Sequence, residues 1–297
     1  MEKRMVQIED GKHISAMIEG DLKGEVIVFV NGSIFNYRQF MRQLYPRISR
    51  ELPHDYSYVF YDYIGIGESS ELGAEGWVID QVVEQHTQFL DALGLDRPHH
   101  FGYSKGAFVT MLANRAKSIA TYGTPNLAYR DETMDKNLKE RKRDVEDGIH
   151  QLRDRRIDKE TYPAVYKELF ESIIFGRREL SLGERIKSFL IRRMIRPTLM
   201  GTPIRSVIEL YRLYAEPYPD LEDYVKRIKE IKDPVLMMHS KQDETVPIEG
   251  TYQLNELLQN SRMAVYENLS HTGPALVGRQ AAPVVKDYLS FLASLQS

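Results

Sequence analysis

Short apolar runs alternate with longer periodic segments over residues 1–125 and again over residues 233–297. The runs are rich in Val, Ile, Tyr and Phe, and most lack a strict alternation of apolar and polar positions. That pattern is typical of strands buried on both faces of a sheet. It predicts strands over residues 25–30, 57–61, 99–103, 118–122, 235–239 and 263–266.

The segments between these runs have the spacing of helices. Apolar positions recur every three or four residues, which predicts helices over residues 37–50, 78–93, 105–115, 250–258 and 283–295. Regular alternation of strand and helix favours a mostly parallel sheet joined by right-handed crossovers and flanked by helices on both faces. The fold class expected from the pattern is therefore α/β.

Residues 126–232 have a different texture, because strand-like runs almost vanish and charged helical segments dominate. We interpret this stretch as an inserted all-helical lid domain. The α/β core is then made of residues 1–125 and 233–297, which come together around the insert.

Charge is divided unevenly between these two parts. The chain has a formal net charge of -3, but residues 126–232 hold 24 Lys and Arg against 20 Asp and Glu, and the remainder holds 16 against 23. Residues 177–212 are the most basic stretch and also carry an apolar helical pattern. Such a helix could attract anionic lipid, a phosphorylated cofactor or an acidic carrier protein, or it could be a solvated face over a buried apolar stripe.

Composition excludes several classes of function. The chain of 297 residues is 42% hydrophobic and 28% charged, as in globular proteins, and has no global excess of basic residues for nucleic acid. It contains no cysteine, which excludes disulfides, thiolate catalysis and Cys-based zinc sites. No apolar run approaches 18 residues and the opening residues lack a signal-peptide core, so we expect a cytoplasmic protein without integral membrane contact.

The most specific motif is Gly102-Tyr103-Ser104-Lys105-Gly106, which lies between a predicted strand and a predicted helix. G-x-S-x-G in this context is typical of a nucleophile elbow, a tight turn that raises the serine hydroxyl above the sheet. Gly102 and Gly106 flank the turn because larger side chains would clash there. The backbone amide of Lys105, at the start of the helix, is placed to stabilise an oxyanion, and we expect its side chain to lie on the helix surface.

A serine hydroxyl needs a base, and eight histidines are available. His271 follows the last predicted strand, and Asp243 follows the strand over residues 235–239, so both should reach the sheet edge that carries Ser104. The other histidines lie in strands or far from that edge. We therefore predict Ser104 as nucleophile, His271 as base and Asp243 as the acid that orients it, with the adjacent Glu244 as the alternative acid.

Two further loops complete the candidate site. After residues 25–30 come Asn31 and Gly32, and the glycine lets the amide of Ser33 point into the site as a second oxyanion donor. Asp62 opens a glycine-rich turn over residues 62–69, where we expect it to bond the turn's own amides rather than act in catalysis. The histidines lack metal-ligand spacing and no phosphate-binding loop is present, so the sequence indicates neither a metal nor another cofactor.

These landmarks together resemble the α/β-hydrolase fold superfamily, specifically serine hydrolases with a helical lid. The resemblance covers about residues 12–125 and 233–295 and includes Asn31-Gly32, the 62–69 turn, the elbow, Asp243 and His271. Many members have histidine where this chain has Asn31. The Asn-Gly start and the basic lid are also loosely similar to the hydroxyacyl acyltransferases that make rhamnolipid precursors.

The function that the residues and the resemblance imply is cleavage of a carboxylic ester or thioester through a covalent acyl-enzyme. An acyltransferase that takes an acyl or hydroxyacyl group from an acyl-carrier or coenzyme A thioester is the alternative. A non-catalytic ligand-binding protein on the same fold is a third possibility. The sequence leaves the substrate and the oligomeric state open.

Overall fold

The computed structural model describes residues 1–32, 35–52, 56–73, 76–129, 132–171, 179–215, 218–243 and 245–296. The strands that these residues form make an eight-stranded sheet of order β1-β2-β4-β3-β5-β6-β7-β8. Strand β3 pairs in parallel with β4 and β5, and parallel pairing continues through β6, β7 and β8. The strands are β1 (Glu2–Gln7), β2 (His13–Glu19), β3 (Val26–Val30), β4 (Ser57–Tyr61), β5 (His99–Tyr103), β6 (Ser118–Tyr122), β7 (Val235–Ser240) and β8 (Ser261–Tyr266).

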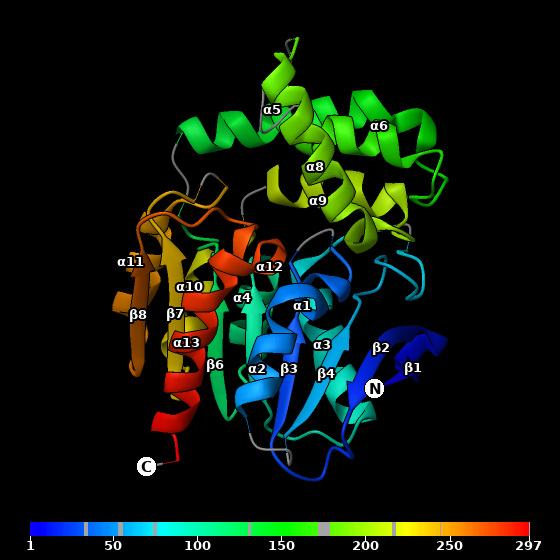
Figure 1. The fold of residues 1–297 in the computed structure, drawn as a ribbon. Coiled ribbons are helices and arrows are strands. Elements are labelled where there is room, and N and C mark those ends of the chain that lie inside the picture. The colour runs from blue at the N-terminus through cyan, green and yellow to red at the C-terminus, as the bar shows by residue number, and fades with distance from the viewer. Residues whose placement is uncertain are drawn as a thin grey trace.

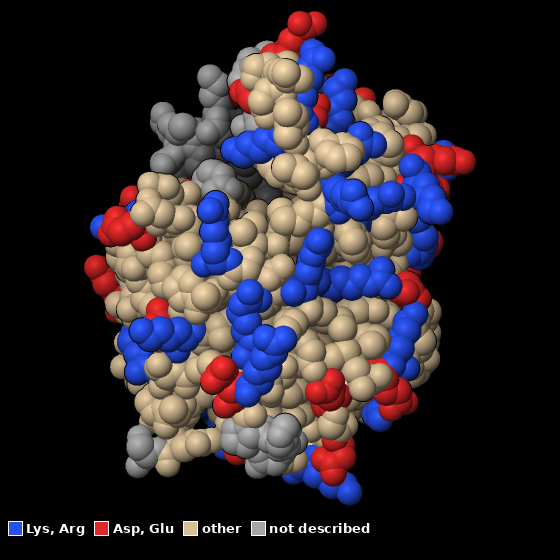
Figure 2. All heavy atoms as spheres, in the orientation of Figure 1, with Lys and Arg blue, Asp and Glu red and all other residues tan. Residues whose placement is uncertain are grey.

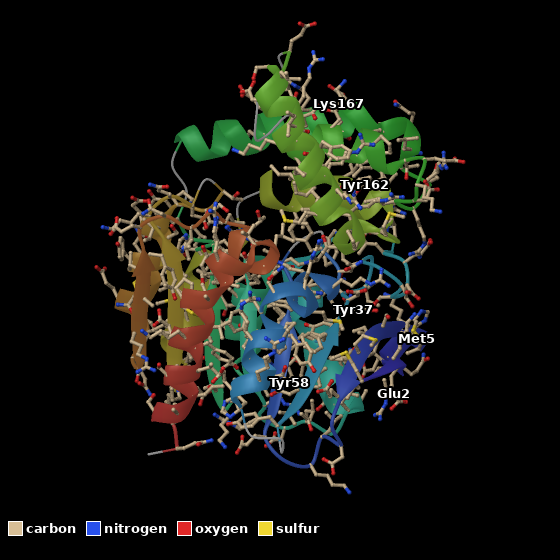
Figure 3. The ribbon with its side chains drawn as sticks, viewed as in Figure 1. Glu2, Met5, Tyr37, Tyr58, Tyr162 and Lys167 are labelled. Atoms are coloured by element: carbon tan, nitrogen blue, oxygen red, sulfur yellow. The ribbon has the colours of Figure 1, made fainter. Side chains whose placement is uncertain are left out.

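All six predicted strands are present, but the sequence pattern missed β1 and β2. These two strands run antiparallel to each other, and β2 is also antiparallel to β4. Strand β1 is the edge of the sheet and is exposed at five of its six positions, so it lacks the apolar run by which the inner strands are recognised. Figure 3 labels Glu2 and Met5 on this outer strand.

Helices cover both faces of the sheet (Figure 1). One face carries α1 (Arg38–Gln43), α2 (Tyr45–Glu51), α12 (Gly273–Leu276) and α13 (Gly278–Ser294). The other carries α3 (Ile79–Ala92), α4 (Lys105–Ala113), α10 (Leu221–Lys229) and α11 (Ile248–Leu257). The single helix predicted over residues 37–50 is two helices, because a proline occupies the first turn of α2 and supplies no amide to continue the ladder of α1.

The buried strands meet these helices through aromatic packing. The ring of Phe29 on β3 stacks on Phe60 of β4 with centroids 4.6 Å apart. Phe40 of α1 meets Phe101 of β5 edge to face at 5.8 Å, and Tyr288 of α13 meets the same ring at 5.0 Å. This cluster fixes β3 and β5, the two strands whose carboxyl ends lead into the candidate site.

Between β6 and β7 the described residues are mainly helical. We use the name helical layer for α5 (Glu132–Ile149), α6 (Tyr162–Tyr166), α8 (Leu182–Leu199) and α9 (Ile204–Ala215), which lie beyond the carboxyl ends of the parallel strands in Figure 1. By contrast, α10 packs against α4 and α11, and Arg227 donates to the carbonyl of Leu112 at 3.1 Å. Short helical turns cover Glu9–Gly11, His150–Leu152 and Lys167–Glu171.

The domain boundaries stay a prediction. In the described part of the chain, no helix combines the length and the apolar character needed to cross a bilayer.

Candidate active site

Ser104 occupies a sharp turn between β5 and α4. Its φ of 49° and ψ of -118° lie outside the regions that serine normally adopts, and its amide donates to the carbonyl of Tyr122 at 2.9 Å. A Cβ atom at Gly106 would overlap the carbonyl oxygen of Val30, and one at Gly102 would press on the start of α4, so only glycine fits beside the turn. The side chain of Ser104 remains partly accessible while its neighbours are buried.

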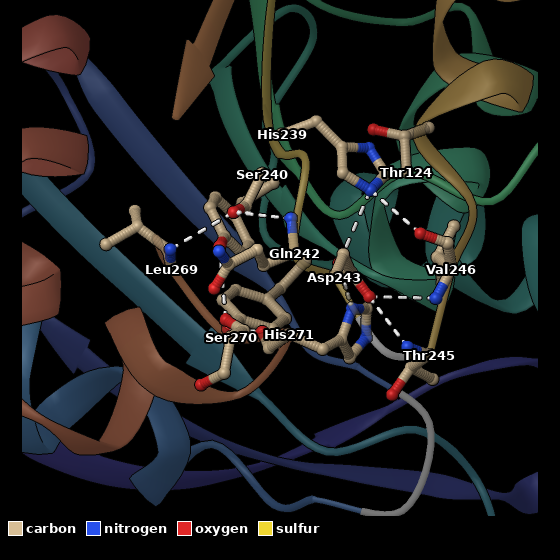
Figure 4. Close-up of polar contacts among 12 residues, drawn as sticks. Thr124, His239, Ser240, Gln242, Asp243, Thr245, Val246, Leu269, Ser270 and His271 are labelled. Atoms are coloured by element: carbon tan, nitrogen blue, oxygen red, sulfur yellow. Dashed lines mark hydrogen bonds and ion pairs between the residues drawn. The ribbon is translucent and has the colours of Figure 1, made fainter. Parts of the chain in front are cut away.

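Asp243 and His271, which are 28 residues apart, meet in a direct contact. The Nδ1 atom of His271 lies 2.7 Å from Oδ2 of Asp243, and the Asp243 side chain is fully buried (Figure 4). Its other oxygen, Oδ1, accepts the amides of Thr245 and Val246 at 2.9 and 2.8 Å. These bonds fix the carboxylate so that one oxygen is directed at the imidazole.

A second histidine approaches the same carboxylate. His239 is fully buried at the end of β7, and its Nε2 atom lies 3.3 Å from Oδ2 of Asp243 and 3.1 Å from the carbonyl of Val246. Its Nδ1 atom lies 2.6 Å from the hydroxyl of Thr251, and the same hydroxyl lies 3.1 Å from the carbonyl of Thr124, so it has two possible acceptors for its one proton. Since Val246 offers an acceptor, Nε2 of His239 carries a proton and can also donate to Asp243.

Opposing effects act on the pKa of Asp243. Burial by itself raises this pKa, but the charge of His271 and the hydrogen bonds from His239 and His271 outweigh burial and hold the pKa below its ordinary value. Asp243 is therefore an ionised hydrogen-bond acceptor at neutral pH. An ionised acceptor at Nδ1 favours the imidazole tautomer whose Nε2 atom carries a lone pair and can accept a proton.

The loop that carries His271 is attached to the elbow. The hydroxyl of Tyr103, the residue before Ser104, donates to the carbonyl of His271, and Tyr122 donates to Ser270 at 3.1 Å. Gly123 lies behind the imidazole, where a Cβ atom would come within 2.8 Å of its Cε1 atom. Strands β5 and β6 thus position the histidine loop and the serine turn together, as expected for carboxyl ends at one sheet edge.

The loop after β3 lies close to the serine, although one predicted donor lies outside the described residues. Ser33 falls in that gap, so its oxyanion role stays a prediction. The amide of Gly32 donates to Oε1 of Gln39 at 3.3 Å, and a Cβ atom at Gly32 would lie 3.6 Å from both Gln39 Oε1 and Ser104 Cβ. Lys105, the other predicted donor, begins α4, and amides of a first helical turn have no acceptor in their own helix.

Asn31 and Asp62 connect this loop to the rest of the sheet. Asn31 donates to the carbonyl of Tyr61 at 2.6 Å and to Asp62 at 3.4 Å, so it ties the ends of β3 and β4 together. Asp62 accepts the amide of Tyr37 at 2.6 Å. Burial raises the pKa of Asp62 to about 7, against the hydrogen bond from the Tyr37 amide, which lowers it. The carboxyl group binds backbone chiefly in the loop after β3, and not chiefly within its own turn as the sequence suggests.

The side chain of Lys105 contradicts the sequence prediction of a surface lysine. It is fully buried, with Nζ 3.6 Å from the ring centroid of Trp77 and 3.9 Å from that of Tyr63. Among the described residues Nζ has no hydrogen-bond partner. Burial lowers the pKa of Lys105 well below its ordinary value, while the two ring faces attract a cation and oppose that shift. The apolar spacing of α4 could not reveal this, because all its residues up to Leu112 are buried.

The described residues contain no group of three or more His, Asp and Glu side chains placed to hold a metal ion. The alternative acid Glu244 lies outside the described part of the chain.

Comparison with known proteins decides the family. Residues 25–274 match the family model described as the alpha/beta hydrolase fold. The chain belongs to this family. In an alpha/beta hydrolase the serine elbow, the acid after a later strand and the late histidine occur in this order along the chain.

Individual relatives of this alpha/beta hydrolase are distant. The chain is 23% identical to a proline iminopeptidase of Heyndrickxia coagulans over 257 residues, 81% of this chain and 84% of that relative. It is 22% identical to the AB hydrolase superfamily protein YisY of Bacillus subtilis (strain 168) over 279 residues, 89% and 91% of the two chains. The esterase EaEST from Exiguobacterium antarcticum superposes with a TM-score of 0.74 at 18% identity over 100% of both chains. At such identity the structural likeness shows the fold alone.

Three contacts of the site were missed by the sequence analysis. Gln39 lies inside the helix predicted over residues 37–50, His239 ends the strand predicted over residues 235–239, and Tyr103 occupies a variable position of the elbow motif. Each is buried, and a polar residue at a buried position next to a motif residue is the signal that could have found them.

Proposed function

We propose that this alpha/beta hydrolase is a serine hydrolase that cleaves a carboxylic ester or thioester. Ser104 is the nucleophile, His271 the base and Asp243 the residue that orients the base. The observation that carries the proposal is the 2.7 Å contact between Asp243 and His271 on a loop that Tyr103 ties to the serine turn. The esterase EaEST, which shares the fold, is an example of a protein on this fold that is named for ester chemistry.

The reaction follows from the proton positions. With Nδ1 of His271 donating to Asp243, Nε2 accepts the proton of Ser104 as its Oγ atom attacks the carbonyl carbon. The carbonyl oxygen becomes an oxyanion that the amides of Lys105 and Ser33 stabilise. The protonated imidazole then gives its proton to the departing alcohol or thiol as the bond to the acyl carbon breaks. Water, deprotonated by His271, releases the acid from Ser104.

Covalent labelling tests the nucleophile. A fluorophosphonate probe is expected to label the wild-type protein once and to leave Ser104→Ala unlabelled, because phosphonylation requires the activated hydroxyl. Ser261→Ala, at a partly exposed position on β8, is the matched control and should label fully. Circular dichroism confirms that both variants are folded. Full labelling of Ser104→Ala would overturn the assignment.

A substrate panel tests which kind of bond the protein cleaves. It runs from short p-nitrophenyl esters to long-chain acyl thioesters, with and without an alcohol acceptor, so that acyl transfer is seen as a condensed product. Since one relative is named a proline iminopeptidase, the panel includes proline p-nitroanilide. Faster cleavage of that amide than of any ester, abolished in Ser104→Ala, would overturn the ester assignment while keeping the nucleophile.

A further inference from the structure

Helix α8 exposes an apolar stripe in the helical layer. Leu182, Ile186, Phe189 and Leu190 have exposed fractions of 77, 56, 61 and 59%, the four highest values among the exposed large hydrophobic side chains of the described residues. At 3.6 residues per turn they fall within an arc of about 100° on one side of the helix. We call these four side chains the α8 stripe. Leaving so much contiguous apolar surface in water is unfavourable, so it indicates a binding face.

The opposite side of α8 is already occupied. Ser188, Ile195, Thr198 and Leu199 are buried. Tyr166 donates to the carbonyl of Ser188 at 2.9 Å, and Tyr162, labelled on α6 in Figure 3, donates to that of Arg192. The sequence pattern is also compatible with an apolar stripe buried beneath a solvated face. The structure shows apolar residues on both sides of the helix, and the α8 stripe is the exposed set.

Basic side chains border the α8 stripe on both flanks. On the same helical geometry Arg185 and Arg196 lie on one side of it, Lys187 lies on the other, and Arg193 continues its line toward the carboxyl end. The acidic residue of the helix, Glu184, is used in a capping box with Ser181. Figure 2 shows Lys and Arg side chains beside uncharged surface over the front of the helical layer.

We propose that α8 is a docking face for the surface of an anionic lipid bilayer. An apolar face flanked by Lys and Arg matches a helix that lies in the plane of a bilayer, with its apolar residues among the acyl chains and its cations at the headgroups. An acidic protein would pair with the basic flanks but would not require four projecting apolar side chains. The proposal concerns peripheral binding and is independent of the chemistry at Ser104.

Co-sedimentation with vesicles tests the proposal. Wild-type protein is mixed with vesicles of phosphatidylcholine alone, or of phosphatidylcholine with about one third phosphatidylglycerol, a fraction that makes the surface anionic. We expect clear binding to the anionic vesicles. This binding should weaken as added salt shortens the screening length from ~10 Å at 0.1 M to ~3 Å at 1 M.

Two double variants separate the apolar and the electrostatic contributions. Phe189→Ser with Leu190→Ser should lower the partition coefficient on anionic vesicles at least about tenfold. Arg185→Gln with Arg193→Gln should lower it by roughly fivefold per charge on anionic vesicles alone. The matched controls lie on α10 and α11: Leu221→Ser with Tyr252→Ser, and Lys226→Gln with Lys229→Gln, should each bind like wild type.

Ser104→Ala should also bind like wild type, so a failure of the proposed chemistry leaves this test intact. The proposal is overturned if the Phe189 and Leu190 double variant binds as well as wild type, or if wild type stays in solution with both vesicle types. Sedimentation velocity adds one distinction. If wild type does not bind vesicles and sediments as a dimer, while the Phe189 and Leu190 double variant sediments as a monomer, the α8 stripe is assigned to a second copy of the chain.

Discussion

At the scale of single residues, Asp243 is defined by the four donors around its carboxylate. Two amides contact Oδ1, and His239 and His271 contact Oδ2. In Asp243→Asn an NH2 group replaces one of the two carboxylate oxygens. It then faces a donor in place of accepting from it, which favours the wrong tautomer of His271. We expect kcat to fall by about 10⁴ with little change in KM. Steady-state kinetics on the best ester measures this, and an unchanged kcat would contradict the role of Asp243.

His239 contacts Asp243 and not the serine turn, so we expect it to act as a positioning residue. His239→Phe removes one donor, which makes the carboxylate more basic and strengthens its pairing with protonated His271. The acid limb of the plot of kcat/KM against pH is then expected to move to higher pH. Activity should also fall about tenfold. His239→Gln, whose amide can still donate, should restore the wild-type profile. A purely structural role would lower activity in both variants without moving the limb.

Lys105 gives a prediction about stability and pH. Its pKa is lowered on folding from the ordinary 10.5, so the unfolded chain binds more protons and stability rises with pH. Lys105→Met fills the same space between Trp77 and Tyr63 without a charge. We expect it to stabilise the protein by at least about 1 kcal/mol at pH 7 and by less near pH 10. Urea unfolding at both pH values checks this, and an equal effect at the two would show that the buried amine stays charged.

At the scale of elements, the carboxyl end of α8 is held by the loop that follows β3. The amide of Asn36 donates to the carbonyl of Thr198 at 2.8 Å, and its side chain donates to the carbonyls of Pro197 and Met200 at 3.3 and 3.2 Å. Arg42 of α1 donates to the carbonyl of Met194. The helical layer is thus bonded to the segment that borders Ser104.

Asn36→Ala should loosen this connection. It removes the two side-chain hydrogen bonds to the carbonyls of Pro197 and Met200 at the end of α8, each worth about 1 kcal/mol, together with the bond that Asn36 accepts from the amide of Arg38. We expect faster amide exchange in α8 and a lower kcat/KM, with the exchange of β5 and β6 unchanged. Hydrogen exchange read by mass spectrometry measures both regions. Unaltered exchange in α8 would contradict the importance of the connection.

The elements differ in how far the sequence could predict them. The bounds of β4, β5 and β6 coincide with the predicted ones, because each of these inner parallel strands is buried at every position and lacks the alternation of a half-exposed strand. Strand β1 was missed because an edge strand exposed on both faces has the composition of a loop. The break between α1 and α2 depended on a proline that the helical spacing alone concealed.

At the scale of the whole molecule, parallel strands explain why a site could be predicted from residues far apart in the chain. Parallel pairing from β3 through β5, β6, β7 and β8 brings their carboxyl ends to one edge, which is why Asp243, after β7, and His271, after β8, can meet. The direction of individual side chains could not be predicted in this way. The side chain of Lys105 points between two aromatic rings, and that of His239 points toward Asp243. Both directions result from packing between elements, which the spacing within one element does not encode.

Trapping the acyl-enzyme tests the central claim most directly. The protein is mixed with a p-nitrophenyl ester that deacylates slowly, quenched in acid, and analysed by intact mass and peptide mapping. Nucleophilic attack by Ser104 predicts one acyl group per chain, located on Ser104, and none in Ser104→Ala. Sustained ester turnover by Ser104→Ala at the wild-type rate, with no acyl group on residue 104 of the wild type, would contradict it.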